Sequence, residues 1–276
     1  MSMNIHHNLK LHNGIEMPLI GLGTYNLEGG RPTVETVKAA LDLGFRSIDT
    51  ASFYNNELEV GEGIKESAVF RKDVFVTTKL WNDEHGYDAA LRAFEASLRR
   101  LDMDYVDLYL IHWPGKDKYI ETWKAFERLY GEGVVKAIGV SNFQEHHLSK
   151  LLSTCNEKPA VNQIELHPRL TQEKLREYCK KLNIKVEAWS PLANGRLLNE
   201  PTINYIAKKH GRTPAQIILR WHVQNDIIVI PKTSSIKRLA ENGNIFDFRL
   251  SMEEMNLIDS LNMNERIGQD PDKMIF

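Results

Sequence analysis

Short apolar runs alternate with longer amphipathic segments along most of the chain. Eight of these runs have the length of buried strands, and several are apolar on both alternating faces, as parallel strands covered on both sides should be. The predicted strands span residues 19–23, 45–49, 74–79, 106–112, 134–140, 160–165, 184–189 and 227–230. Between them, apolar residues recur at helical spacing, most clearly in residues 34–43 and 87–101.

Eight strands that alternate with helices predict an α/β fold of the TIM-barrel type, a (β/α)8 barrel in which residues 1–276 form a single domain. No stretch rich in Pro, Gly or Ser divides the chain. A doubly wound open sheet is the alternative, and it usually carries a GxGxxG turn after its first strand. Here Gly21 and Gly23 are followed by Asn26 where the third glycine would stand, which favours the barrel.

The two ends of the chain depart from the alternation of strands and helices. Residues 9–17 flank the pair Asn13-Gly14, a strong hairpin signal, and predict a β-hairpin that closes the bottom of the barrel. Residues 251–262 predict an extra helix near the C-terminus. Within the barrel, Thr171 is predicted as a helix N-cap and Thr213-Pro214 as a helix start.

The composition excludes several classes of protein. The chain is 42% hydrophobic and 26% charged with a net charge of −2, so it has no general attraction to nucleic acid or to an anionic membrane. Cys155 and Cys179 lie far apart and outside any CxxC pattern, which argues against a disulfide framework or a thiolate metal site. The first ten residues lack the apolar core of a signal peptide, and no apolar run reaches the length of a membrane span. We therefore predict a cytoplasmic protein with neither a nucleic-acid nor a membrane partner.

Four polar residues that can share a proton lie at or just beyond the ends of three predicted strands: Asp49, Tyr54, Lys79 and His112. The active site of a TIM barrel lies at these carboxyl ends, so the four side chains should meet. A nearby lysine ammonium would lower the phenol pKa from its usual value of about 10, and a carboxylate would keep that lysine charged. Histidine can orient a carbonyl or share in the proton transfer. Each residue alone also fits an ordinary structural role, but their joint placement predicts a site that protonates an oxygen while its carbon is attacked.

A series of motifs, in the same order along the chain, closely resembles those of the aldo-keto reductase family. The motifs of the first half are GLGTY at 21–25, DTA at 49–51 followed by Tyr54 and Asn56-Glu57, TTKLW at 77–81 and LYLIHWP at 108–114. Those of the second half are GVSNF at 139–143, QIELHP at 163–168, AWSPL at 188–192, and IPK at 230–232 followed by Arg238 and Glu241-Asn242. The resemblance covers essentially the whole chain. Within the family it is similar to the short microbial and protozoal members, which include 2,5-diketogluconate reductases and trypanosomatid prostaglandin F synthases.

The resemblance implies an NADPH-dependent reductase of aldehydes and ketones, with Tyr54 as the general acid of a tetrad that includes Asp49, Lys79 and His112. It also implies that NADPH or NADP+ binds in an extended conformation without a Rossmann fold. The residues expected to bind the cofactor are Gly23, Thr24, Tyr25, Asp49, Ser141, Asn142, Gln163, Trp189, Ser190, Pro191, Leu192, Ile230, Pro231, Lys232, Thr233, Ser234, Arg238, Glu241 and Asn242. The substrate is expected to contact Tyr25, Phe53, Tyr54, Trp81, His112 and Trp113.

Two of the implied roles have an independent physical basis. Lys232 and Arg238 flank a helix start rich in hydroxyls, and cations, hydroxyls and free backbone donors together suit a phosphate dianion. The same residues also fit a solvated, basic helix end. Trp189 offers a flat ring for nicotinamide stacking at a strand end, although a strand-end tryptophan also fits the core.

The resemblance leaves the substrate and the biological role open. After residues 270–273, only residues 274–276 are available to cover the rim of the pocket. So short a cover predicts an open pocket and broad specificity. Glyoxal or methylglyoxal, aromatic aldehydes, diketo sugar acids and prostaglandin-type substrates all fit. The alternative function is an NADPH-binding sensor or auxiliary subunit with weak reductase activity, and the family implies a monomer.

His146 and His147 do not match a metal-binding spacing beside other ligands, so we predict surface helix residues there and no metal site.

Overall fold

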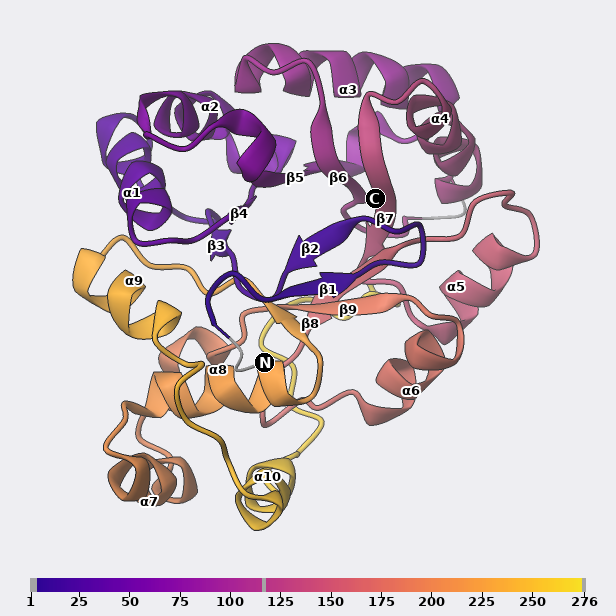
Figure 1. Ribbon diagram of the computed structural model, residues 1–276. Coiled ribbons are helices and arrows are strands. Elements are labelled where there is room, and N and C mark those ends of the chain that lie inside the picture. The colour runs from indigo at the N-terminus through magenta and orange to yellow at the C-terminus, as the bar shows by residue number, and fades with distance from the viewer. Residues whose placement is uncertain (1–3, 116–117, 275–276) are drawn as a thin grey trace.

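Eight parallel strands form one curled sheet in the computed structural model of the chain, which describes residues 4–115 and 118–274 (Figure 1). The strands are hydrogen-bonded in chain order. They are β3 (Leu22–Gly23), β4 (Ser47–Asp49), β5 (Phe75–Leu80), β6 (Val106–Ile111), β7 (Val135–Ser141), β8 (Val161–Glu165), β9 (Lys185–Trp189) and β10 (Ile228–Val229). A parallel bridge between Ile20 and Val229 joins the two edges of the sheet. This closure confirms the predicted (β/α)8 barrel.

Burial on both faces explains why the strands could be recognised from apolar runs alone. Every residue of β5 and β6 is buried, as parallel strands covered by helices should be. All eight predicted strands are present, with ends that differ by up to three residues. The largest difference is at the first strand, where residues 19–21 lie before β3 and pair with β10 through Val229, whose backbone N–H donates to the carbonyl of Leu19 at 3.0 Å.

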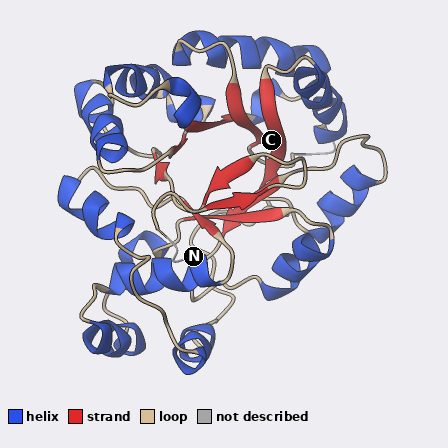
Figure 2. Cartoon of the chain, in the orientation of Figure 1, coloured by secondary structure: helices blue, strands red, loops and turns tan. Residues whose placement is uncertain are grey.

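Helices surround the barrel on its outer side (Figure 2). The helices are α1 (Arg31–Asp42), α2 (Glu57–Glu66), α3 (Tyr87–Leu101), α4 (Tyr119–Gly131), α5 (Glu145–Leu152), α6 (Glu173–Lys181), α7 (Pro201–His210), α8 (Pro214–Gln224), α9 (Ile236–Gly243) and α10 (Met252–Asp259). The sequence predicted α1 and α3 from apolar spacing, and α10 is the predicted extra helix. No helix in the described part of the chain is both long and apolar enough to cross a membrane.

One predicted helix start is confirmed and another is wrong. Thr213 caps α8, since its hydroxyl accepts the backbone N–H of Gln216 at 3.3 Å. Thr171, by contrast, does not cap α6. Gln172 occupies that position in a left-handed conformation, because its side-chain amide donates to the backbone carbonyl of Glu165 at 2.6 Å and holds the residue there.

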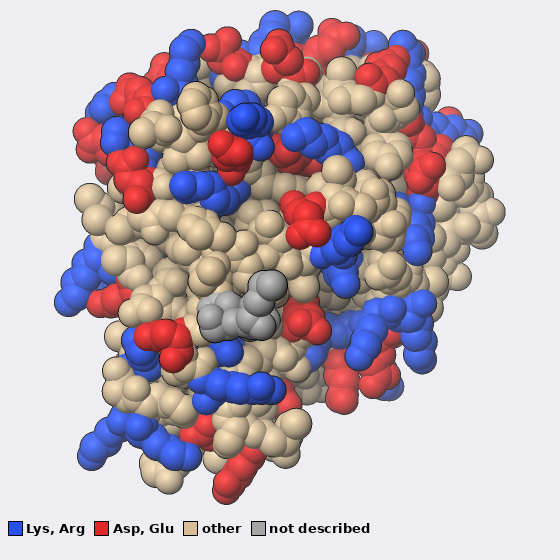
Figure 3. All heavy atoms as spheres, viewed as in Figure 1, with Lys and Arg blue, Asp and Glu red and all other residues tan. Residues whose placement is uncertain are grey.

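The N-terminal hairpin crosses the barrel opening that faces the viewer in Figure 1. It consists of the antiparallel strands β1 (Asn8–Lys10) and β2 (Glu16–Pro18), joined through the predicted Asn-Gly turn. The amide of Asn13 donates to the carbonyl of Lys136 at 3.0 Å. Because Lys136 is the second residue of β7, the hairpin covers the amino ends of the strands and leaves their carboxyl ends free for a site. Acidic and basic side chains intermingle on this face (Figure 3), in keeping with the small net charge.

Candidate active site

The four predicted tetrad residues converge at the carboxyl ends of their strands. Asp49 is the last residue of β4, Lys79 lies near the end of β5, and His112 follows β6 directly. Tyr54 ends the short 3-10 helix Ser52–Tyr54. The ammonium of Lys79 donates to Asp49 Oδ1 at 2.6 Å and to the Tyr54 hydroxyl oxygen at 3.3 Å. The side chain of Lys79 is completely buried, so this geometry is held by the barrel and not by solvent-exposed rotamers.

Burial and the neighbouring charges determine the protonation states of the tetrad. Burial raises the pKa of Tyr54 to about 12, although the charge of Lys79 acts in the opposite direction. The lysine therefore has the predicted effect, but burial exceeds it and the expected net lowering of the phenol pKa is wrong. Burial also disfavours the ammonium of Lys79, yet the Asp49 carboxylate and Tyr54 more than compensate and raise its pKa. At neutral pH the site thus holds a protonated phenol beside a charged lysine.

His112 is a neutral imidazole next to the phenol. Burial, together with the charge of Lys79, brings the pKa of His112 well below its usual value. Its ring packs edge-on against Tyr54 and Trp81, with centroid separations of 5.6 and 5.0 Å. A neutral imidazole in this position can hydrogen-bond to a carbonyl oxygen that Tyr54 also contacts.

Hydrogen bonds hold the predicted nicotinamide platform in place. The indole N–H of Trp189 donates to Asn142 Oδ1 at 2.9 Å, and the amide of Asn142 donates to the backbone carbonyl of His112 at 3.0 Å. The ring plane of Trp189 is therefore tied to the strand end that carries His112. The hydroxyl of Ser141 donates to the carbonyl of Gln163 at 2.9 Å, which joins β7 to β8 at the same level.

The predicted phosphate site lies at the start of α9. Ser235 caps this helix by accepting the backbone N–H of Arg238 at 3.4 Å, and Thr233 is buried just before it. Within the described part of the chain, neither Lys232 nor Arg238 forms an ion pair, whereas the neighbouring Lys237 lies 3.9 Å from Glu241. Two unpaired cations at a helix N-terminus are suited to an anionic group.

One cavity of about 980 Å³ joins the tetrad to this helix start. The predicted residues that line it are Gly23, Tyr25, Asp49, Phe53, Tyr54, Trp81, His112, Trp113, Ser141, Asn142, Gln163, Trp189, Ser190, Pro191, Leu192, Ile230, Pro231, Lys232, Thr233, Arg238, Glu241 and Asn242. Thr24 and Ser234 are not among the lining residues. Thr24 is fully buried and donates its hydroxyl to the backbone carbonyl of Asp49 at 2.9 Å, so it supports the tetrad strand from behind.

Comparison with known proteins gives the family. The model of the aldo/keto reductase family matches residues 19–263. This chain belongs to the aldo/keto reductase family. It is 54% identical to a glyoxal reductase of Bacillus subtilis over the full length of both chains. It is 50% identical to a 9,11-endoperoxide prostaglandin H2 reductase of Trypanosoma cruzi, with 98% of this chain and 97% of that protein covered. Among solved structures, a mutant of Gox0644 in complex with NADPH matches with 46% identity and a TM-score of 0.93 over the whole of both chains.

The tetrad end of the cavity in this aldo/keto reductase has aromatic walls. Phe53 stacks on Trp81 with a centroid separation of 3.7 Å, and Tyr25 packs against Tyr54 at 5.0 Å. Phe53 thus anchors its loop by stacking on Trp81 and also lines the cavity. Both Tyr25 and Phe53 are about half exposed, which leaves the entrance open.

The C-terminal tail contributes more to the pocket than the sequence analysis predicted. Ile267, Gly268, Gln269 and Met274 all line the cavity, whereas residues 275 and 276 lie outside the described part of the chain. Glu165 anchors the tail, because its carboxylate accepts the backbone N–H groups of Ile267 at 2.7 Å and Gly268 at 3.1 Å. The sequence placed Glu165 in a family motif without a role, and its acidic character at a strand end was the available signal.

Sequence reasoning also missed Glu187, a fully buried acid beneath the tetrad. The side-chain amide of Gln163 donates to Glu187 Oε2 at 2.7 Å and to Asp49 Oδ2 at 2.8 Å. Both hydrogen bonds use the amide nitrogen, and Gln163 also lines the cavity. Within the described residues, Glu187 Oε1 has no hydrogen-bond partner. Burial, followed by the nearby charge of Asp49, raises the pKa of Glu187 to about 8.

This buried acid predicts a specific dependence of stability on pH. The unfolded chain releases the Glu187 proton near pH 4.5 and the folded protein near pH 8, so the native state is progressively destabilised as the pH rises between these values. Glu187→Gln keeps an acceptor for Gln163 and removes the titration. We expect the difference in unfolding free energy, variant minus wild type, to increase from pH 5 to pH 8 and to stay constant above pH 8. Urea denaturation at a series of pH values measures this difference. A difference that does not change with pH would show that Glu187 is ionised in the native protein throughout.

Proposed function

We propose that this protein reduces aldehydes and ketones with NADPH, and that Tyr54 supplies the proton. The observation that carries this proposal is the ammonium of Lys79, which contacts both Asp49 and the Tyr54 hydroxyl at one end of a cavity whose other end reaches two unpaired cations. The dinucleotide would be held by Trp189 at its nicotinamide end and by Lys232 and Arg238 at the 2′-phosphate. The NADPH complex of the similar Gox0644 structure supports this assignment.

The residues of the chain perform the acid–base part of the reaction. The bound cofactor supplies a hydride to the carbonyl carbon. As the carbon–oxygen π bond opens, its electron pair takes the proton of Tyr54, and the hydroxyl O–H bond breaks to leave a phenolate. The ammonium of Lys79 stabilises that phenolate, and the Asp49 carboxylate keeps the lysine charged. Neutral His112 orients the carbonyl oxygen toward Tyr54, so the proton moves only when the substrate is aligned.

The pocket favours substrates that are small and uncharged near the carbonyl. Its substrate end is formed by aromatic rings and by the tail residues Gln269 and Met274. Among the described residues that line the cavity, the lysine and arginine side chains are those of Lys232 and Arg238. Both lie at the start of α9, where we propose that the 2′-phosphate binds. A carboxylate near the reacting carbonyl would lose its hydration without gaining an ion pair. We therefore place α-oxoaldehydes and aromatic aldehydes ahead of keto acids, in line with the name of the similar glyoxal reductase.

A matched substrate pair tests this function. NADPH oxidation is followed with 4-formylbenzamide and 4-carboxybenzaldehyde, which have nearly the same shape and differ mainly in charge, and with methylglyoxal against glyoxylate, both of which offer an aldehyde. We expect kcat/KM to be at least about tenfold lower for each carboxylate, which corresponds to about 1.4 kcal/mol of unpaid desolvation. Equal values within a pair would contradict the substrate assignment, whereas no turnover of any carbonyl would favour the sensor or auxiliary role.

Two further observations support a proposal for the location and the assembly state of the protein. Both cysteines are unpaired, which suits a reducing compartment such as the cytoplasm. The four tetrad residues and the two cations at the start of α9 all belong to this chain, so these parts of the site do not require a second copy. We propose a cytoplasmic, monomeric enzyme on these grounds.

A further inference from the structure

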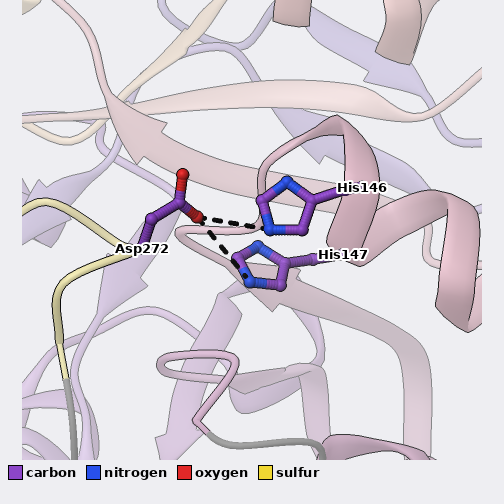
Figure 4. Close-up of side chains that lie close together, drawn as sticks. All are labelled: His146, His147 and Asp272. Carbon is purple, nitrogen blue, oxygen red and sulfur yellow. Dashed lines mark ion pairs between the residues drawn. The ribbon is translucent and has the colours of Figure 1, made fainter.

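Two adjacent histidines and one tail carboxylate lie close together away from the tetrad. His146 and His147 are the second and third residues of α5, and Asp272 belongs to the tail that follows α10. His146 Nε2 lies 3.3 Å from Asp272 Oδ1, and His147 Nε2 lies 3.9 Å from the same oxygen (Figure 4). All three donor atoms lie within 4.8 Å of one another, and this is the one such group of three metal-ligand side chains among the residues that the structure describes.

We propose that His146, His147 and Asp272 bind a divalent zinc-type ion that ties the C-terminal tail to α5. Imidazole nitrogen and carboxylate oxygen are ligands that Zn²⁺ accepts, and three protein ligands leave a fourth position for water. Donors about 2.1 Å from a tetrahedral ion are about 3.4 Å apart. The separation of His146 from Asp272 already matches this spacing. The distance from His147 Nε2 to Asp272 Oδ1 needs to shorten by about half an ångström, which the half-exposed side chain of Asp272 can provide by rotation.

The surroundings of the three ligands allow a cation to bind. Lys273 does not neutralise Asp272, since its ammonium lies 3.4 Å from Asp270 instead. His146 and Asp272 are more than half exposed, so an ion can enter from solvent. His147 is less exposed, and its Nδ1 accepts the backbone N–H of Gln144 at 3.1 Å. Coordination through Nε2 moves the ring proton to Nδ1 and breaks this capping bond, so binding is predicted to be reversible and weaker than at a structural zinc site.

The position of Asp272 gives the ion a consequence for the pocket. The tail is already anchored at Ile267 and Gly268 by Glu165. Gly268 packs directly against the ring of Trp189, and Met274 lines the cavity just beyond Asp272. An ion at Asp272 would add a second anchor, so the tail between the two anchors would be held against the pocket. The sequence could not show this site, because the third ligand lies more than a hundred residues from the two histidines.

Zinc titration of the full-length, untagged protein tests the proposal independently of any reductase activity. Binding of ZnCl2 is measured by isothermal titration calorimetry, and Co²⁺ absorption reports the coordination geometry. We expect one ion per chain, and we expect His146→Gln and Asp272→Asn each to weaken binding at least tenfold. The adjacent pair His6 and His7 provides a matched control, since one is exposed and the other partly buried but no carboxylate completes a three-ligand group with them among the described residues.

The outcomes separate a site from incidental histidine binding. Replacement of both His6 and His7 by glutamine should leave zinc affinity unchanged, and zinc should slow amide hydrogen exchange in residues 267–274 of the wild-type protein. No saturable zinc binding by wild type would overturn the proposal. So would equal affinity of the wild-type, His146→Gln and Asp272→Asn proteins, or loss of binding only in the His6 and His7 variant.

Discussion

Replacement of Tyr54 by phenylalanine is expected to lower kcat for aldehyde reduction by about 100- to 10,000-fold, the range that a positioned general acid contributes. The variant removes one oxygen, the acceptor of the Lys79 hydrogen bond at 3.3 Å, and leaves the ring and its packing in place. Hydride transfer would then have to form an alkoxide without a proton donor. The measurement is kcat with 4-nitrobenzaldehyde at saturating NADPH, together with the NADPH dissociation constant from fluorescence, which should stay within about twofold.

Tyr25→Phe is the matched control for this variant. Tyr25 lies in the same pocket with its ring 5.0 Å from that of Tyr54, but it is half exposed, and the described hydrogen-bond partners of the Lys79 ammonium are Asp49, Thr50 and Tyr54. Loss of its hydroxyl should change kcat by less than about threefold, which is roughly 0.7 kcal/mol. A Tyr54→Phe enzyme as fast as the Tyr25→Phe enzyme would remove Tyr54 from the role of general acid.

The second large effect is expected at the phosphate end of the cavity. Arg238→Ala should weaken NADPH binding by about 10- to 100-fold and leave NADH binding nearly unchanged, since a hydrogen bond between charged groups contributes about 1.5–3 kcal/mol. Arg238 lines the cavity and forms no ion pair within the described part of the chain, so its charge is available for the 2′-phosphate. Dissociation constants for both dinucleotides, measured by fluorescence quenching at fixed ionic strength, test this expectation.

Lys237 offers a neighbouring cation as the control. Its side chain is 86% exposed, it lies 3.9 Å from Glu241, and it does not line the cavity. Lys237→Ala removes the same unit of charge from the same helix, so it accounts for the general electrostatic effect. If the two variants weakened NADPH equally, or if Arg238→Ala weakened NADH as much as NADPH, Arg238 would not contact the 2′-phosphate.

The strands and the tetrad could be predicted from sequence because both follow from local rules. A parallel strand buried on both faces is a continuous apolar run, and the polar residue that ends the run marks a catalytic position. Asp49, Lys79 and His112 each stand at or next to the end of such a run. Helix starts were less certain. Thr213 caps its helix, while at Thr171 a contact between Gln172 and the strand residue Glu165 moved the start by one residue.

The residues that were missed depend on contacts between distant segments. Glu187 looks like any acid in a strand until the barrel places it beside Gln163 and Asp49. Glu165 gains its role only because the tail returns to meet it, about a hundred residues later in the chain.

The sequence by itself determined the barrel and predicted Tyr54 as the proton donor and a basic end of the cofactor path, because these depend on residue type and on order along the chain. The tertiary structure decided the direction in which the pKa of Tyr54 moves, since burial outweighs the charge of Lys79 and raises the pKa to about 12. It also decided the shape of the pocket rim and brought Asp272 to His146 and His147. The physical reason is the same in each case: desolvation and long-range contact exist only once the chain has folded.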